Sequence, residues 1–169
     1  MNKKNFFLFL SFSALGIKEL LKGIREDFVS RKRFQKIVYL LQEISSFPLS
    51  YRYNLYIYGP YSPDLTKDLF LMSEDFSNLN ALSADYTLKE EITKKITQIK
   101  DDILDVRPAS MDEVDWIELV ATYHYLASKK YFDEDECKKY IEANKGHLSV
   151  HVDEARKVVD NIVPRNQGQ

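Results

Sequence analysis

The chain has 169 residues, of which 44% are hydrophobic and 30% are charged, so it can fold around one well-filled core. Its single cysteine, Cys137, excludes an internal disulfide framework, and its five widely spaced glycines exclude a glycine-rich phosphate-binding loop. The net charge is only −2 but is unevenly spread: residues 1–58 hold ten Lys or Arg against four Asp or Glu, whereas residues 101–160 hold eight against fifteen. With so few Gly and Pro to form long loops, we expect a mainly helical (α+β) protein. The lone cysteine suits the reducing cytoplasm, where we expect the protein to be located.

The first segment has two interpretations. Apolar positions continue at helical spacing from Phe7 to Ile24, which predicts one core helix from about Asn5 to Arg25. The alternative is a secreted protein with a signal peptide over residues 1–16, because positive charges there precede a short apolar run. No stretch of about 20 apolar residues occurs, so we expect no association with a membrane.

A second helix is predicted after the polar link at residues 26–27. Ser30 is a suitable N-cap, and the apolar positions from Phe34 to Ile44 follow helical spacing. Positive charge at a helix N-terminus opposes the helix dipole. Four cations nevertheless crowd the first two turns of this helix: Arg31, Lys32, Arg33 and Lys36.

An aromatic segment follows this helix. Residues 51–58 alternate in the manner of a strand, and Gly59 with Pro60 is predicted to end that strand. Ser62 is predicted to cap the next helix, with Pro63 at the first helical position, where a missing N–H costs nothing. A short strand near residues 84–88 would complete a small sheet, and winged-helix-like features are compatible with this pattern.

The remaining segments predict a polar connection at residues 76–86 and then four helices. The first spans residues 87–106 with an isoleucine seam, and the second is capped by Ser110. The third begins at Asp133, and the last follows Gly146. Pro108 marks a predicted boundary, which gives a core of residues 1–108, a packed C-terminal helical segment of residues 109–163, and a disordered tail of residues 164–169.

Few residues suggest chemistry. His147 and His151 have the spacing of a helical metal-binding pair, but without further ligands nearby they are better interpreted as ordinary polar residues. His124, inside a strongly apolar helix, is predicted to be hydrogen-bonded or partly exposed rather than to act as a base. No nucleophile elbow or paired-carboxylate motif is present. We therefore expect no enzymatic activity, no metal and no cofactor.

The basic start of the second helix is the best candidate for binding. Its four cations, with exposed tyrosines, suit either phosphate groups or a protein surface. The third interpretation is that they pair with the acidic C-terminal half. The candidate binding residues are Arg31, Lys32, Arg33, Lys36, Arg52, Tyr56 and Tyr58.

Two segments together resemble a known family. The order RFQKIVYL at residues 33–40, followed by YIYGPYSPDL at residues 56–65, resembles the prokaryotic YwgA-like proteins. More distantly, it is similar to the Panacea, or SocA-like antitoxin, domain. The match covers about residues 28–72. The family motif falls on Tyr39, Gly59, Pro60, Tyr61 and Pro63, which we interpret as scaffold.

The resemblance implies a non-enzymatic intracellular protein that acts by binding a protein partner such as a toxin, in the manner of an antitoxin or adaptor. A DNA-binding, winged-helix-like regulator that uses the basic helix start is the alternative. The segment before Tyr86 is short and polar, which argues against a full wing.

Overall fold

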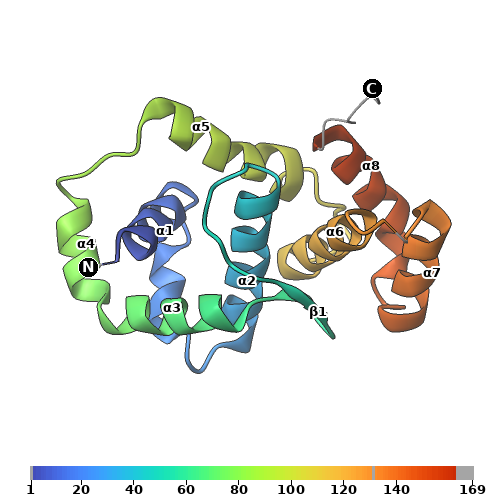
Figure 1. The fold of residues 1–169 in the computed structure, drawn as a ribbon, viewed down its shortest axis with the longest axis horizontal. Coiled ribbons are helices and arrows are strands. Elements are labelled where there is room, and N and C mark those ends of the chain that lie inside the picture. Colours follow the sequence, from blue (N-terminus) through green and yellow to red (C-terminus); the bar gives the residue numbers. More distant parts are fainter. Residues whose placement is uncertain (1, 131, 163–169) are drawn as a thin grey trace.

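The computed structural model describes residues 2–130 and 132–162, and it confirms a mainly helical fold with one small antiparallel sheet (Figure 1). The predicted tail at residues 164–169 lies outside the described part. None of the described helices is long and apolar enough to cross a membrane. The elements are α1 (Lys3–Ala14), η1 (Lys18–Gly23), α2 (Phe28–Glu43), β1 (Asn54–Tyr56), β2 (Gly59–Tyr61), α3 (Pro63–Glu74), α4 (Phe76–Ser83), α5 (Glu90–Ile99), η2 (Lys100–Leu104), α6 (Glu113–Ala127), α7 (Glu134–Asn144), η3 (Ser149–His151) and α8 (Val152–Ile162).

The single long N-terminal helix was a wrong prediction. Helix α1 ends at Ala14, because Gly16 takes a positive φ of 72° and turns the chain into the 3-10 helix η1. The buried face of α1 also differs from the predicted stripe, since Leu8, Phe9 and Phe12 are fully buried whereas Phe7, where the stripe was predicted to begin, is only partly buried. Helix α1 thus contributes to the core through a different set of side chains.

Helix α2 begins two residues before the predicted cap. Asp27 is the N-cap, because its Oδ1 accepts hydrogen bonds from the backbone N–H groups of Val29 (2.9 Å) and Ser30 (3.2 Å). Ser30, predicted as the cap, lies inside the first turn and donates its hydroxyl to Asp27. The helix is buried continuously from Phe34 to Leu41, because it passes through the middle of the molecule.

The predicted strand at residues 51–58 is instead the first arm of a tight hairpin. Strand β1 pairs antiparallel with β2, with Tyr56 opposite Gly59, so that Ile57 and Tyr58 form a two-residue turn. Gly59 and Pro60 therefore lie within the sheet and do not end it. No strand forms near residues 84–88, where the structure has coil.

Helix α3 agrees with its prediction. The hydroxyl of Ser62 accepts from the backbone N–H of Leu65 at 3.3 Å, and Pro63 occupies the first helical position. The next segment does not agree, because residues predicted as a polar connection form helix α4, which buries Phe76 and Leu79 against the core.

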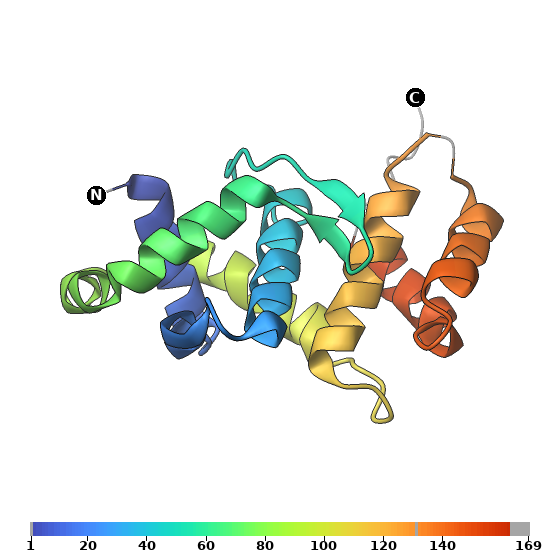
Figure 2. The ribbon, with the colours of Figure 1, turned by 90° about the horizontal axis from the view of Figure 1, so that it is seen from below.

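Helix α6 is the central element of the C-terminal half. It packs against α2 and β2 on one side and against α7 and α8 on the other (Figures 1 and 2). Its cap is Asp112, whose side chain accepts from the N–H of Asp115, and not the predicted Ser110. Because one hydrophobic cluster extends from Phe6 to Val159, the two predicted parts share a core, and the boundary at residue 108 stays a prediction.

Candidate binding site at the hairpin

The hairpin rests on α2 and α6 at a place where only glycine fits. Gly59 has a φ of 84°, which side chains rarely adopt. A Cβ atom there would lie 2.5 Å from the hydroxyl of Thr122 on α6 and 3.3 Å from Cε of Lys36 on α2. The predicted scaffold role of Gly59 therefore has two physical causes, the positive φ and the close approach of β2 to both helices.

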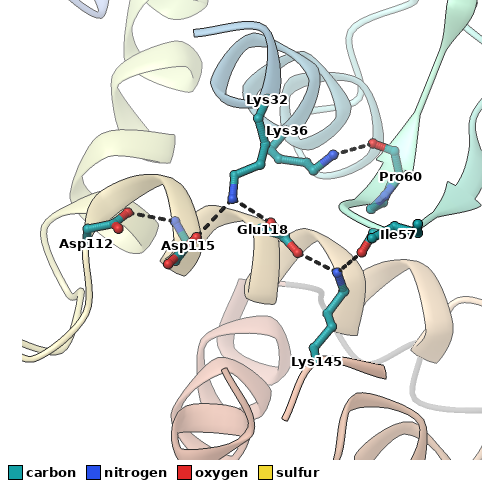
Figure 3. A network of polar contacts seen from close by, with 8 residues as sticks. All are labelled: Lys32, Lys36, Ile57, Pro60, Asp112, Asp115, Glu118 and Lys145. Carbon is teal, nitrogen blue, oxygen red and sulfur yellow. Dashed lines mark hydrogen bonds and ion pairs between the residues drawn. The ribbon is translucent and has the colours of Figure 1, made fainter. Parts of the chain in front are cut away.

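Lys36 connects helix α2 to strand β2 of the hairpin. Its side chain is 2% exposed, and its Nζ donates a hydrogen bond to the carbonyl of Pro60 at 2.8 Å (Figure 3). Among the described residues, no carboxylate oxygen lies within ion-pair distance of this ammonium. Burial without a counter-ion lowers the pKa of Lys36 to about 7.

Glu118 is the centre of a buried charge network beneath the hairpin turn. Its carboxylate pairs with Lys32 of α2 at 2.7 Å and with Lys145, which follows α7 (Figure 3). Burial by itself would raise the pKa of Glu118, but hydrogen bonds from the two lysines outweigh it and hold the pKa below its ordinary value. Lys145 also donates to the carbonyl of Ile57, so the network ends on the hairpin turn itself.

Two more polar contacts fix the hairpin and α3 to α2. The side-chain amide of Gln35 accepts from the N–H of Ser62 and donates to the carbonyl of the same residue, both at 2.9 Å.

Tyr39, predicted as scaffold, is buried and shares a 2.8 Å hydrogen bond between its hydroxyl and Nδ1 of His124. This contact confirms the hydrogen-bonded interpretation of His124, and burial lowers the pKa of its imidazole. Tyr61 reaches the hydroxyl of Thr66 at 2.9 Å.

The predicted basic cluster is largely occupied within the chain. Arg31 donates to the carbonyls of Ile24 and Arg25, which lie between η1 and α2. Lys32 binds Asp115 as well as Glu118, and Arg33 lies 3.2 Å from Glu113. These acidic partners all come from α6, as the interpretation of pairing with the C-terminal half expects. Arg52 is exposed, on the segment before β1.

The outer side of the hairpin is exposed and apolar, in contrast to the charged contacts beneath it. Ile57 at its tip is 79% exposed, and the flanking Tyr56 and Tyr58 are 52% and 49% exposed. Phe28, at the first turn of α2, is 46% exposed and contacts the ring of Tyr58 edge-on, with ring centroids 5.0 Å apart. We call Phe28, Tyr56, Ile57 and Tyr58 the hairpin surface.

A cleft of about 450 Å³ opens between the hairpin, the first turns of α2 and helix α3. Five aromatic side chains line it: Phe28, Tyr56, Tyr58, Tyr61 and Phe70. We call it the aromatic cleft. It brings together five of the predicted binding residues, since Arg31, Lys32 and Lys36 also line it with Tyr56 and Tyr58.

The two histidines near the C-terminus lie in different surroundings. His147 is exposed, whereas His151 contacts the hydroxyl of Ser110 at 2.9 Å through Nε2. They do not share a helix face, because α8 begins only at Val152. Within residues 2–130 and 132–162, no group of three His, Cys, Asp or Glu side chains could hold a metal ion. Cys137 is a buried free thiol whose pKa burial raises to about 11.

Sequence reasoning missed Glu118, Lys145, Gln35 and Phe28. Glu118 had a signal, because it is the only charged residue between Trp116 and Ala127 in an otherwise apolar helix, so its charge had to be paired on burial. Lys145 had none, since its partner Ile57 lies 88 residues away in the chain. Comparison of the chain with protein-family models, curated proteins and solved structures gave no match.

Proposed function

We propose that this chain is a non-enzymatic interaction protein that binds a protein partner through the hairpin surface. In line with the YwgA-like and Panacea-like resemblance of residues 28–72, the proposal places it in the prokaryotic cytoplasm, as an antitoxin-like or adaptor-like protein. The partner surface it fits is mainly apolar, because the hairpin surface presents Ile57 and three aromatic rings.

The observation that carries the proposal is an exposed apolar tip on a rigid base. Large apolar side chains that gather on the surface mark interaction sites, because exposure to water costs free energy unless a partner covers them. Ile57 and Tyr58 lie in a two-residue turn whose neighbouring carbonyls, of Ile57 and Pro60, accept from buried lysines. A turn held in this way loses little entropy on binding, so contacts at its tip contribute more fully to affinity.

Contact with DNA, the alternative prediction, has less support from the charges. A protein that binds duplex DNA needs cations that can replace the counterions of phosphates. Lys32 and Arg33 already face carboxylates of α6, and Lys36 is 2% exposed, so it can meet only a group small enough to enter the aromatic cleft that it lines. We expect no gel shift of duplex DNA at low salt. A shift that weakens steeply as salt rises would favour the DNA-binding alternative.

The test uses two equally exposed residues. Ile57, in the hairpin turn, is 79% exposed, and Val150, in η3, is 78% exposed. Tagged wild-type chain, the Ile57→Asp variant and the Val150→Asp variant are purified from cells of the source organism, and co-purifying proteins are quantified by mass spectrometry. We expect one protein in near-stoichiometric amount with the wild type and with Val150→Asp, reduced at least about tenfold with Ile57→Asp. Equal recovery with all three chains would contradict the proposal.

A further inference from the structure

The charged residues that line the aromatic cleft all have the same sign. Three of its lining residues are cationic, namely Arg31, Lys32 and Lys36, and none of the residues that line it is acidic. The rest of the lining is mainly aromatic. A volume of about 450 Å³ lies within the range of small-molecule sites, which are mostly apolar with a few polar groups that fix orientation. An occupant that matches this lining combines an apolar ring with a negative charge.

Lys36 is the cation that a negatively charged occupant would pair with. An ammonium has three N–H donors, and the structure gives this one a single acceptor, the carbonyl of Pro60. Lys32, by contrast, already contacts two carboxylates. The charged groups that act on Lys36 are Glu118 of α6, whose carboxylate is bound to both other lysines, with Lys32 of α2 and Lys145 beyond α7. A ligand carboxylate would be the first counter-ion of Lys36.

The apolar walls restrict the class of anion. Moving a strongly hydrated dianion such as phosphate next to five aromatic side chains costs more free energy than moving a monoanion. The hydroxyl of Thr66 and the amide of Gln35, which also line the cleft, already hydrogen-bond to each other at 2.9 Å and to neighbouring groups. One unpaired ammonium in an aromatic cleft suits a single carboxylate.

We propose that the aromatic cleft is a binding site for a small aromatic monocarboxylate, whose ring packs among the aromatic walls and whose carboxylate accepts a hydrogen bond from Nζ of Lys36. This site goes beyond the proposed protein contact. The residues of the hairpin surface also line the cleft, but the carboxylate would be held by Lys36, which is not part of that surface, so ligand binding does not depend on a partner. The ring stacks or packs edge-on against the aromatic lining, and the charge sets the preference for an anion.

Two probes of nearly equal shape test the charge preference. 2-Naphthoate and 2-naphthamide have the same ring system, and they differ by a carboxylate against a neutral amide. Each is titrated into the ¹⁵N-labelled full-length chain at pH 6.5 and followed by amide chemical shifts. We expect naphthoate to bind at least about tenfold more tightly than naphthamide, as a charge-assisted hydrogen bond implies, with the largest shifts at Tyr58, Gly59 and Phe70.

Variants distinguish the effect of the Lys36 charge from nonspecific apolar binding of the probes. Lys36→Met keeps the apolar stem and should bring naphthoate affinity down to that of naphthamide. Lys67→Met, a control that removes an exposed cation from the same helix as Phe70, should leave the preference unchanged. Phe70→Ala should weaken both probes together. The amide spectrum of each free variant shows whether it remains folded.

The pH dependence gives a third readout. As pH rises from 6.5 to 9, Lys36 loses its proton, so naphthoate affinity should fall while naphthamide affinity stays constant. Equal affinity of the two probes for the wild type would overturn the proposal. So would a charge preference that persists in Lys36→Met, or shifts that map away from the hairpin, α2 and α3.

Discussion

The two sides of α2 use different physics to hold their neighbours. On the N-terminal side, α2 contributes Phe34 to an apolar core with Leu8, Phe9 and Phe12, and the rings of Phe12 and Phe34 lie 4.6 Å apart. On the side that faces the hairpin, the same helix contributes Lys36, which reaches the carbonyl of Pro60, and Lys32, which reaches the carboxylate of Glu118. Apolar burial stabilises the first side, whereas the second side buries charge, which by itself costs free energy.

The difference between the apolar side and the charged side of α2 indicates the role of the buried charges. A well-packed apolar joint would hold two elements together at least as well as buried ion pairs do. Charged groups instead fix the orientation of the hairpin, because Lys36 and Lys145 each donate to one of its backbone carbonyls. We infer that the charge network positions the hairpin turn more than it stabilises the fold. The predictions below test this contrast, beginning with the largest expected effect.

Loss of the central carboxylate should be the most damaging change. Glu118→Gln leaves the ammonium groups of Lys32 and Lys145 without their shared buried counter-ion, so we expect a loss of about 3 to 5 kcal/mol of unfolding free energy in urea. The control is Glu113→Gln, which removes the more exposed partner of Arg33 and should cost less than about 1 kcal/mol. Similar losses of unfolding free energy in both variants would show that Glu118 contributes no more to stability than an exposed ion pair does.

The glycines at positive φ separate packing from backbone strain. Gly16→Ala adds a Cβ with nothing within 4 Å, so only strain of about 1 kcal/mol is expected. Gly59→Ala adds the same strain and also brings Cβ against Thr122, so its loss should be about 3 kcal/mol. Thermal unfolding of both variants measures the difference. Equal losses would mean that the hairpin can move away from α6 at little cost.

The buried Lys36 predicts a particular pH dependence of stability. Its pKa is about 7 when folded and 10.5 when unfolded, so between these values the unfolded chain binds one more proton and unfolding free energy rises with pH. Relative to Lys36→Met, wild-type stability should therefore rise by up to about 1.4 kcal/mol per pH unit from pH 7.5 to 9.5. The comparison cancels the titration of Cys137. A constant difference would show that Lys36 has an ordinary pKa.

The smallest effect on stability is expected at the hairpin tip. Ile57→Asp changes a side chain that contacts mostly water, so its urea midpoint should stay within about 0.5 kcal/mol of the wild type. The same should hold for Val150→Asp. A loss above 1 kcal/mol in Ile57→Asp alone would mean that this residue serves the fold.

The sequence was sufficient where a local pattern decides the structure. Ser62 with Pro63 predicted the start of α3, and Asp133 with Glu136 forms the capping box that opens α7. It was insufficient where two local patterns compete. Asp27 and Ser30 are both good caps, and only the structure selects Asp27.

The candidate site was harder to predict than the fold. The cluster from Arg31 to Lys36 was visible in the sequence, but its counter-ions on α6 lie about 80 residues away, so its neutralisation follows from tertiary packing. In the hairpin, aromatic residues alternate on both faces, which hid the turn at Ile57 and Tyr58. The exposed tip became evident only once the hairpin was placed on α2 and α6.

The central claim is that the hairpin tip contacts a protein partner. The most direct measurement is photo-cross-linking in cells of the source organism, with benzoylphenylalanine at position 57 in one chain and at position 150 in another. The account predicts one discrete adduct from position 57, none from position 150, and loss of the first adduct when Glu118→Gln releases the turn. No adduct from position 57, or the same adducts from both positions, would contradict it.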